Sequence, residues 1–230
     1  MTDQAPIDIT SVFSVGGHGW DSPELRTVTP TQKAARDVAE ALRRLARELE
    51  TTSATPDELD ALTAQIDALT SSLAEGDARG TTDGDPPHVV YQAHRLRERS
   101  PFIGRANPVA LPLVVEFVEG GIDAIANFGT LYEGPPGCLH GGYIAGIFDE
   151  VLGAAQTLAG QAGMTGRLTV HYRSPTPLKT DLHLRARLVS VSGRKILCKG
   201  TLHAGDRLCA EAEGLFIAVD PKKLLELAGQ

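Results

Sequence analysis

A long apolar stretch between Gly142 and Gly160 limits the possible folds of this chain more than any other part of its sequence. Its apolar residues recur at helical spacing around most of the circumference, so most of this helix must be buried. Those residues are Ile144, Ile147, Phe148, Val151, Leu152 and Ala155. Asp149 and Glu150 interrupt the stretch near its centre, and two carboxylates there argue against a membrane span. We therefore expect a helix buried inside a globular domain.

Segments typical of β-strands lie on both sides of this predicted helix. Before it, residues 113–118 and 122–128 are expected to form two strands, joined tightly at 119–121. After it, apolar and polar residues alternate in four segments, 168–172, 182–188, 196–202 and 208–219, the last becoming apolar on both faces near its end. Alternation of this kind is typical of a sheet with one solvated face. The order predicts an α+β fold in which one antiparallel sheet wraps around a long central helix.

Residues 1–100 are predicted to be an N-terminal extension that precedes this domain of residues 101–230. Apolar residues repeat at helical spacing between Gln32 and Leu49. Thr55, Pro56 and Glu58 then have the pattern of a capping box at the start of a second helix. A narrow apolar stripe follows on that helix, formed by Leu59, Leu62, Ile66, Leu69 and Leu73. We expect a helical hairpin that packs on the main domain or on a partner, followed by a linker at 74–88.

The composition excludes some classes of function. The net charge of −7 and the pI of about 5.5 give no reason to expect a nucleic-acid partner. The three cysteines suggest no disulfide framework, and the N-terminus lacks the basic start and apolar stretch of a leader peptide. The histidines show no ligand-like spacing. The expectation is a cytoplasmic protein without a metal ion or a cofactor.

The start of the central helix has the composition of an anion site. Gly141 and Gly142 leave the backbone N–H groups of the helix N-terminus accessible, and these groups attract negative charge. A thioester carbonyl that becomes an oxyanion needs such donors. His140 precedes the glycines and is placed to orient the thioester or the loop. The alternative is a simple glycine turn before a helix, with His140 as a surface cap.

Asp149 is the candidate catalytic carboxylate, because it lies among apolar neighbours within the predicted helix. Facing a substrate tunnel, it would act as a general base on water or attack the carbonyl directly. The alternatives are a polar partner in the core or a solvated position on a narrow polar face. Glu150 points about 100° away around the helix, so the two carboxylates are not expected to serve one site easily.

The spacing between His140 and Asp149 has a consequence for assembly. Nine positions in a helix correspond to roughly 13.5 Å, so both side chains cannot reach one thioester carbonyl from the same helix. If both are catalytic, each site combines the helix start of one protomer with the aspartate of another. We therefore expect a homodimer or a dimer of dimers with active sites at the subunit interface.

The segment from Tyr132 to Gly142, with Asp149 nine residues after the histidine, resembles the hotdog-fold thioesterase superfamily. It is most similar to the branch that contains the carboxyl-terminal modulator protein, and more distantly similar to PaaI-like thioesterases. The resemblance extends over residues 101–225 and includes 164–165, 172–178, 193–195 and 215–217. It implies a hotdog fold and the hydrolysis of acyl-CoA thioesters.

The resemblance also implies roles for individual residues. Gly141 and Gly142 would supply the oxyanion hole, Asp149 would activate water or attack, and Thr165 would assist it. The alternative for Thr165 is a hydroxyl that bonds the backbone at the start of a strand. One departure is Gly134, which stands where some relatives have an amide side chain.

Substrate binding is expected to involve basic side chains, because coenzyme A carries several phosphates. Arg173, Arg194 and Lys195 are candidates by charge, with solvated strand-end positions as the alternative for each. The favoured function is acyl-CoA thioester hydrolysis. The alternative is a non-catalytic acyl-CoA-binding regulatory module on the same fold. A hydratase is less favoured, because no acid–histidine pair for proton removal stands out.

Overall fold

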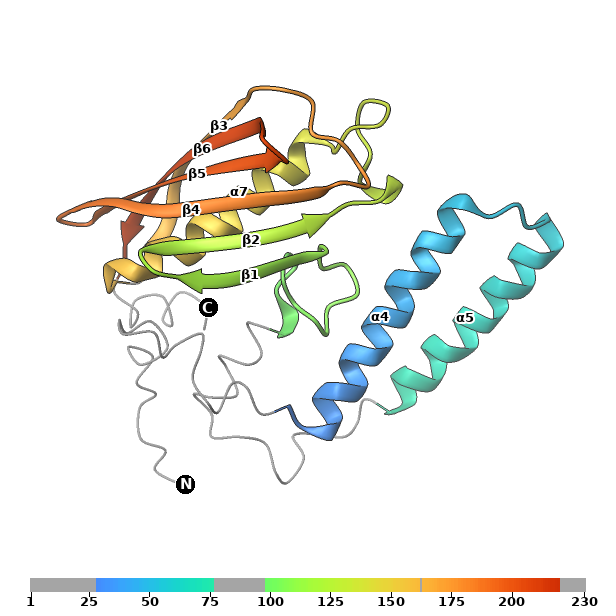
Figure 1. Cartoon of the computed structure of the whole chain (residues 1–230). Helices are drawn as coiled ribbons and strands as arrows, with labels where there is room; N and C mark the ends of the chain where they lie inside the picture. Colours follow the sequence, from blue (N-terminus) through green and yellow to red (C-terminus); the bar gives the residue numbers. More distant parts are fainter. Residues whose placement is uncertain (1–27, 77–97, 162, 220–230) are drawn as a thin grey trace, which may run out of the picture.

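The computed structural model describes residues 28–76, 98–161 and 163–219 of the chain. Figure 1 shows a curved sheet with one helix lying across it, and two further helices to one side. Most of the linker predicted at 74–88 and the last eleven residues of the chain lie outside the described residues.

Six strands form a single antiparallel sheet in the order β1-β2-β4-β5-β6-β3. The strands are β1 (Leu113–Val118), β2 (Gly121–Asn127), β3 (Gly163–Tyr172), β4 (Asp181–Ser192), β5 (Lys195–Ala204) and β6 (Arg207–Ala218). Tight turns join β4 to β5 at Gly193 and β5 to β6 at Gly205, where φ values of 57° and 58° favour glycine. β1 and β3 are therefore the two edges of the sheet.

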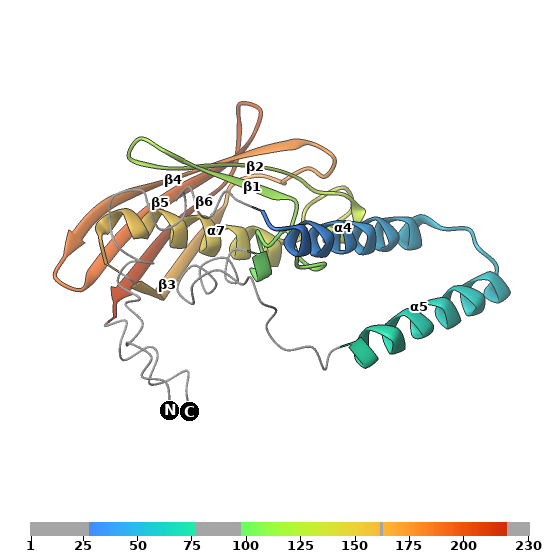
Figure 2. The ribbon, with the colours of Figure 1, turned by 90° about the horizontal axis from the view of Figure 1, so that it is seen from below.

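The central helix α7 (Gly141–Gln156) lies against the inner face of the sheet (Figures 1 and 2). Each of its predicted core residues is at most 3% exposed, and together with the inward residues of the strands they form the core. A short 3₁₀ turn, η2 (Thr157–Ala159), completes the predicted length, and Gly160 ends it with a φ of 78°. The predicted fold class, an antiparallel sheet around a buried helix with an N-terminal helical part, is confirmed.

The edge strand β3 differs from its prediction in two respects. It begins at Gly163, so Thr165 lies within the strand instead of before it. Its pairing with β6 continues across a register shift between Thr165 and Arg167, which breaks the alternation by which strands are recognised. Tyr172, expected on the apolar face, is 56% exposed.

Two helices precede the sheet, α4 (Pro30–Thr51) and α5 (Pro56–Gly76). The predicted capping box of α5 is confirmed: the Thr55 N–H donates to Glu58 Oε2 at 2.7 Å, and the Glu58 N–H donates to Thr55 Oγ1 at 3.4 Å. Thr29 and Gln32 form a second capping box at the start of α4. These caps explain why both helices begin where they do.

The two helices differ in how they pack. α4 lies beside the sheet domain, whereas α5 lies farther out (Figures 1 and 2). The second half of the apolar stripe predicted on α5 is exposed, with Leu69 and Leu73 at 67% and 72%, whereas Leu59 and Leu62 are half-buried. None of the described helices combines the length and the apolar character needed to cross a membrane.

Candidate active site

The first turn of α7 has one backbone N–H that no described group accepts. His140 is the N-cap residue, and its Nδ1 accepts the Gly142 N–H at 3.0 Å. The N–H groups of Tyr143 and Ile144 donate to the His140 carbonyl. Among the described residues, no group accepts a hydrogen bond from the Gly141 N–H. The cap therefore uses the Gly142 N–H, whereas the Gly141 N–H is available to a ligand. This corrects the expectation that the amides of both glycines are available.

The cap also fixes how His140 presents its ring. Because Nδ1 accepts a hydrogen bond, the proton of the neutral imidazole is on Nε2, which becomes a donor. The loop before the helix packs closely on this residue: a Cβ at Gly134 would lie 2.8 Å from the His140 Cα. No side chain fits at position 134 without moving the loop, which explains the absence of the amide found in some relatives.

Tyr172 is a residue of this region that the sequence analysis did not identify. Its hydroxyl donates to the Gly141 carbonyl at 2.9 Å, which ties the start of α7 to the end of β3. The alternation in β3 had suggested a core position for Tyr172. A tyrosine hydroxyl can donate a hydrogen bond, and that property is the signal that could have suggested a polar contact for Tyr172.

Asp149 lies on the middle of α7, where it faces a cavity of about 760 Å³. Thr165 on β3 donates its hydroxyl to Asp149 Oδ1 at 2.9 Å. The cavity is lined mainly by residues of β1, α7 and the start of β3. The structure thus brings Thr165 and Asp149 together, although they are 16 positions apart in the sequence.

Glu150 also lines this cavity, which corrects the expectation that the two carboxylates face different sites. The sheet covers only part of α7, so its open face is wide enough to include adjacent residues 100° apart. Burial raises the pKa of Glu150, and the charge of Asp149 adds to that effect. The Ser100 hydroxyl, 3.3 Å from Glu150 Oε1, opposes it. Glu150 therefore holds its proton to a higher pH than an exposed glutamate does.

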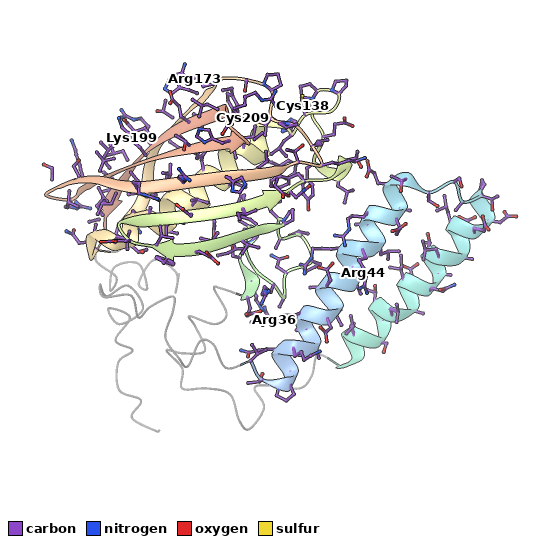
Figure 3. All side chains as sticks on the ribbon, in the orientation of Figure 1. Arg36, Arg44, Cys138, Arg173, Lys199 and Cys209 are labelled. Carbon is purple, nitrogen blue, oxygen red and sulfur yellow. The ribbon has the colours of Figure 1, made fainter. Side chains whose placement is uncertain are left out.

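The three basic candidates do not converge within one chain. Arg173 follows the end of β3 and forms an ion pair with Glu211, whose pKa is lowered by that contact. Arg194 donates to the Ala218 carbonyl at 3.0 Å, and Lys195 begins β5 opposite Ile217. Since β3 runs from Gly163 to Tyr172, Arg173 lies one strand length, roughly 30 Å, from the pair at 194–195. Figure 3 shows Arg173 at the upper border of the sheet.

The candidate residues fall into two groups at different ends of one molecule. His140, Gly141 and Arg173 lie near the start of α7, whereas Asp149 and Thr165 lie by the cavity at the start of β3. Lys195 belongs with the second group, since its β6 partner, Ile217, also pairs with Met164 next to Thr165.

Two of the three cysteines are too deeply buried to act as nucleophiles. Burial raises the pKa of Cys198 to about 12, so its thiol stays protonated and unreactive at neutral pH. Cys209 is fully buried and Cys138 is half-buried. Within residues 28–76, 98–161 and 163–219, no group of three or more potential ligands could hold a metal ion.

Comparisons with known proteins point to one group of enzymes. Residues 136–211 match a family described as the thioesterase superfamily. Acyl-coenzyme A thioesterase THEM4 of Bos taurus is 36% identical over 97 residues, which are 41% of this chain and 40% of that protein. The THEM4 of Mus musculus is 37% identical over 110 residues, 47% of each. The chain thus spans less than half the length of these curated relatives.

A solved structure extends the likeness beyond the sheet domain. The crystal structure of a thioesterase superfamily protein is 31% identical, with a TM-score of 0.70. The match covers 80% of this chain and 90% of that one. This coverage exceeds the predicted domain of residues 101–230, so the likeness reaches into the N-terminal extension.

Proposed function

The chain belongs to the thioesterase superfamily, and on this premise we propose that it hydrolyses acyl-coenzyme A thioesters to a free acid and coenzyme A. The names of the curated relatives support this substrate class. The observation that carries the proposal is the Thr165–Asp149 hydrogen bond at the wall of the cavity. It fixes a carboxylate where the acyl end of a substrate can reach it.

Asp149 serves as the general base or as the nucleophile. The Thr165 hydroxyl donates to Oδ1, which leaves Oδ2 free to accept a proton from water. The water oxygen then bonds to the thioester carbon, the carbon–sulfur bond breaks, and the thiolate takes up a proton. In the nucleophilic version, Oδ2 itself bonds to the carbon, the carbon–sulfur bond breaks and the thiolate leaves and takes up a proton; water then hydrolyses the resulting mixed anhydride to free acid and the Asp149 carboxylate. Thr165 has the same role in both versions, holding the carboxylate in one orientation.

The Gly141 N–H and the positive end of the α7 dipole stabilise the oxyanion in this proposal. His140 contributes in two ways. Its Nδ1 fixes the glycine turn through the Gly142 N–H, and its Nε2–H is a second donor for the thioester. Removing one oxyanion donor typically costs roughly 2.7–4 kcal/mol of barrier.

A second copy of the chain completes the site. The start of α7 is roughly 13.5 Å from Asp149 along the helix, which is too far for one carbonyl. The edge of β3 supports an assembly of two copies, because no described strand pairs with the outer side of its ten residues. A homodimer, or a dimer of such dimers, would bring Arg173 of one copy toward Arg194 and Lys195 of the other. Coenzyme A phosphates would bind there.

The proposal predicts that Asp149→Asn abolishes turnover while leaving binding intact. Release of free thiol from a series of acyl-CoA substrates is the measurement, and we expect a decrease of at least about 100-fold, the lower range for loss of a general base. Asp206→Asn is the matched control, because Asp206 is exposed in the β5–β6 turn. Normal turnover in Asp149→Asn would remove the aspartate from the mechanism.

A non-catalytic acyl-CoA-binding module is the second candidate function. The same assay separates the two functions. Saturable binding of acyl-CoA by the wild-type chain, with no thiol released at any acyl length, would select the binding module.

A further inference from the structure

Residues 98–111, which we call the wall segment, lie between α4 and the active-site helix α7. The segment has turns but no strand, and its residue Ile103 lines the cavity together with Asp149. Its own hydrogen bonds fold it into a compact loop, for example from the Ala106 N–H to the Glu98 carbonyl and from the Leu111 N–H to the Phe102 carbonyl. These bonds define the fold of the segment itself, whereas its position against α7 also depends on contacts with the neighbouring elements.

On its outer side, the wall segment is held by two arginines of α4. The guanidinium of Arg36 donates from Nε and from a terminal nitrogen to the two carboxylate oxygens of Glu98. Glu98 is only 7% exposed, and this contact raises the pKa of Arg36. Arg43, two turns along α4, donates to the carbonyls of Asn107 and Arg105 at 2.6 and 3.2 Å. Figure 3 shows Arg36 between α4 and the sheet domain.

On its inner side, the same segment contacts α7. The Ser100 hydroxyl accepts the N–H groups of Phe102 and Ile103, so its own proton is directed to Glu150 Oε1. The ring of Phe102 lies against Gly146, where a Cβ would be 2.6 Å from Cε1. Both contacts require the segment to keep its present conformation.

We propose that α4 is a clamp that fixes the wall segment, and that Ile103 thereby limits the acyl group that the cavity accepts. Arg36 and Arg43 are positioning residues in this arrangement, and Ile103 is the specificity-determining residue. The part that concerns acyl groups rests on the proposed function, whereas the clamp itself does not. The N-terminal helices would thus shape the active site without touching the substrate.

The first experiment measures the clamp without any substrate. Amide hydrogen exchange of residues 100–111 is compared in wild type, Arg36→Gln and Arg43→Gln. Arg44→Gln is the matched control, since this arginine is exposed on α4 (Figure 3) and no described residue is hydrogen-bonded to it. We expect exchange in the wall segment to be at least about tenfold faster in Arg36→Gln, because Glu98 becomes an unpaired buried charge. Arg36→Lys should restore part of the protection.

The second experiment measures the consequence for substrate choice. Turnover is followed across acyl chain lengths in Ile103→Ala and in the two clamp variants. We expect Ile103→Ala to shift the preferred acyl group to a longer one. Arg36→Gln and Arg43→Gln should raise KM about tenfold and broaden the length preference, while kcat at saturation changes less than about threefold, because substrate binding is affected and the catalytic groups are not.

The outcomes separate the clamp from the proposed reaction. Faster exchange in the wall segment supports the clamp even if no acyl-CoA is hydrolysed. Unchanged exchange in both Arg36→Gln and Arg43→Gln, relative to Arg44→Gln, would overturn it. A length preference unaltered by Ile103→Ala would overturn the specificity role. If Arg36→Gln fails to fold, Arg43→Gln still tests the clamp, since it removes two hydrogen bonds to carbonyls and an ion pair with the exposed Glu40, and leaves no buried charge unpaired.

Discussion

At the scale of single residues, the adjacent carboxylates of Asp149 and Glu150 show how environment separates two chemically similar groups. Asp149 accepts the hydroxyl of Thr165, whereas Glu150 lies under the wall segment beside Ser100. Burial is the main cause of the raised pKa of Glu150. In the proposed reaction Asp149 activates water, while Glu150 keeps its proton to a higher pH than an exposed glutamate does.

This difference predicts how stability depends on pH. Because the folded chain holds the Glu150 proton more tightly than the unfolded chain does, the free energy of unfolding falls as the pH rises from about 4.3 through the raised folded value. Glu150→Gln removes that decrease, so the variant gains stability relative to wild type across this range. Urea unfolding of both proteins at a series of pH values measures this difference in stability. Parallel stability curves for the two proteins would contradict the prediction.

At the scale of elements, α7 carries both the core and the candidate site. Its buried side packs on the sheet, while its open side faces the cavity and the wall segment. Two glycines on the helix lie in different surroundings: Gly146 is covered by Phe102, whereas nothing lies within 4 Å of a Cβ at Gly153. A glycine inside a helix is unfavourable by itself, so the close contact explains only the first of them.

The surroundings of the two glycines predict that the same substitution changes the free energy of unfolding differently at each. Gly153→Ala should raise the free energy of unfolding by up to about 1 kcal/mol, because alanine is the better helix former. Gly146→Ala should be less stable than Gly153→Ala by about 1–3 kcal/mol, the usual cost of overpacking, because Phe102 must move. Denaturant unfolding of both variants measures the difference. Equal stabilisation would show that Phe102 adapts freely.

At the scale of the whole molecule, the two groups of candidate residues are separated along α7. The His140–Gly141 end is tied to Tyr172 at the far end of β3, and the Asp149–Thr165 end lies by the cavity. No motion short of unfolding the helix brings the two ends together within one chain. This separation is the physical reason for proposing that two copies share each site.

Shared sites predict that two inactive variants complement each other. Gly141→Val covers the free amide with a branched side chain, and Asp149→Asn removes the base, so each protein alone should be inactive. Mixed subunits should recover about a quarter of wild-type turnover, because half of the random dimers are mixed and each then has one intact site. Thiol release after unfolding and refolding the two together is the measurement. No recovery, with mixed dimers detected by mass, would place the site within one chain.

Much of this arrangement follows from the sequence alone. The periodicity of α7 specified a buried helix, the alternating segments specified strands with one polar face, and Thr55 with Glu58 specified a helix start. These are local properties, because side-chain direction in a helix or strand is fixed by backbone geometry. The resemblance on 132–142 and Asp149 likewise singled out the candidate site residues.

The tertiary structure alone decided the contacts between distant segments. The sequence left open whether His140 would cap the helix, and it did not reveal that Tyr172 would bond the Gly141 carbonyl or that Glu150 would share the cavity. It also gave no role to Arg36, whose partner Glu98 is 62 positions away. Periodicity specifies which face of an element is buried, but the partner of a polar group depends on how elements approach one another in space, and no local pattern encodes that approach.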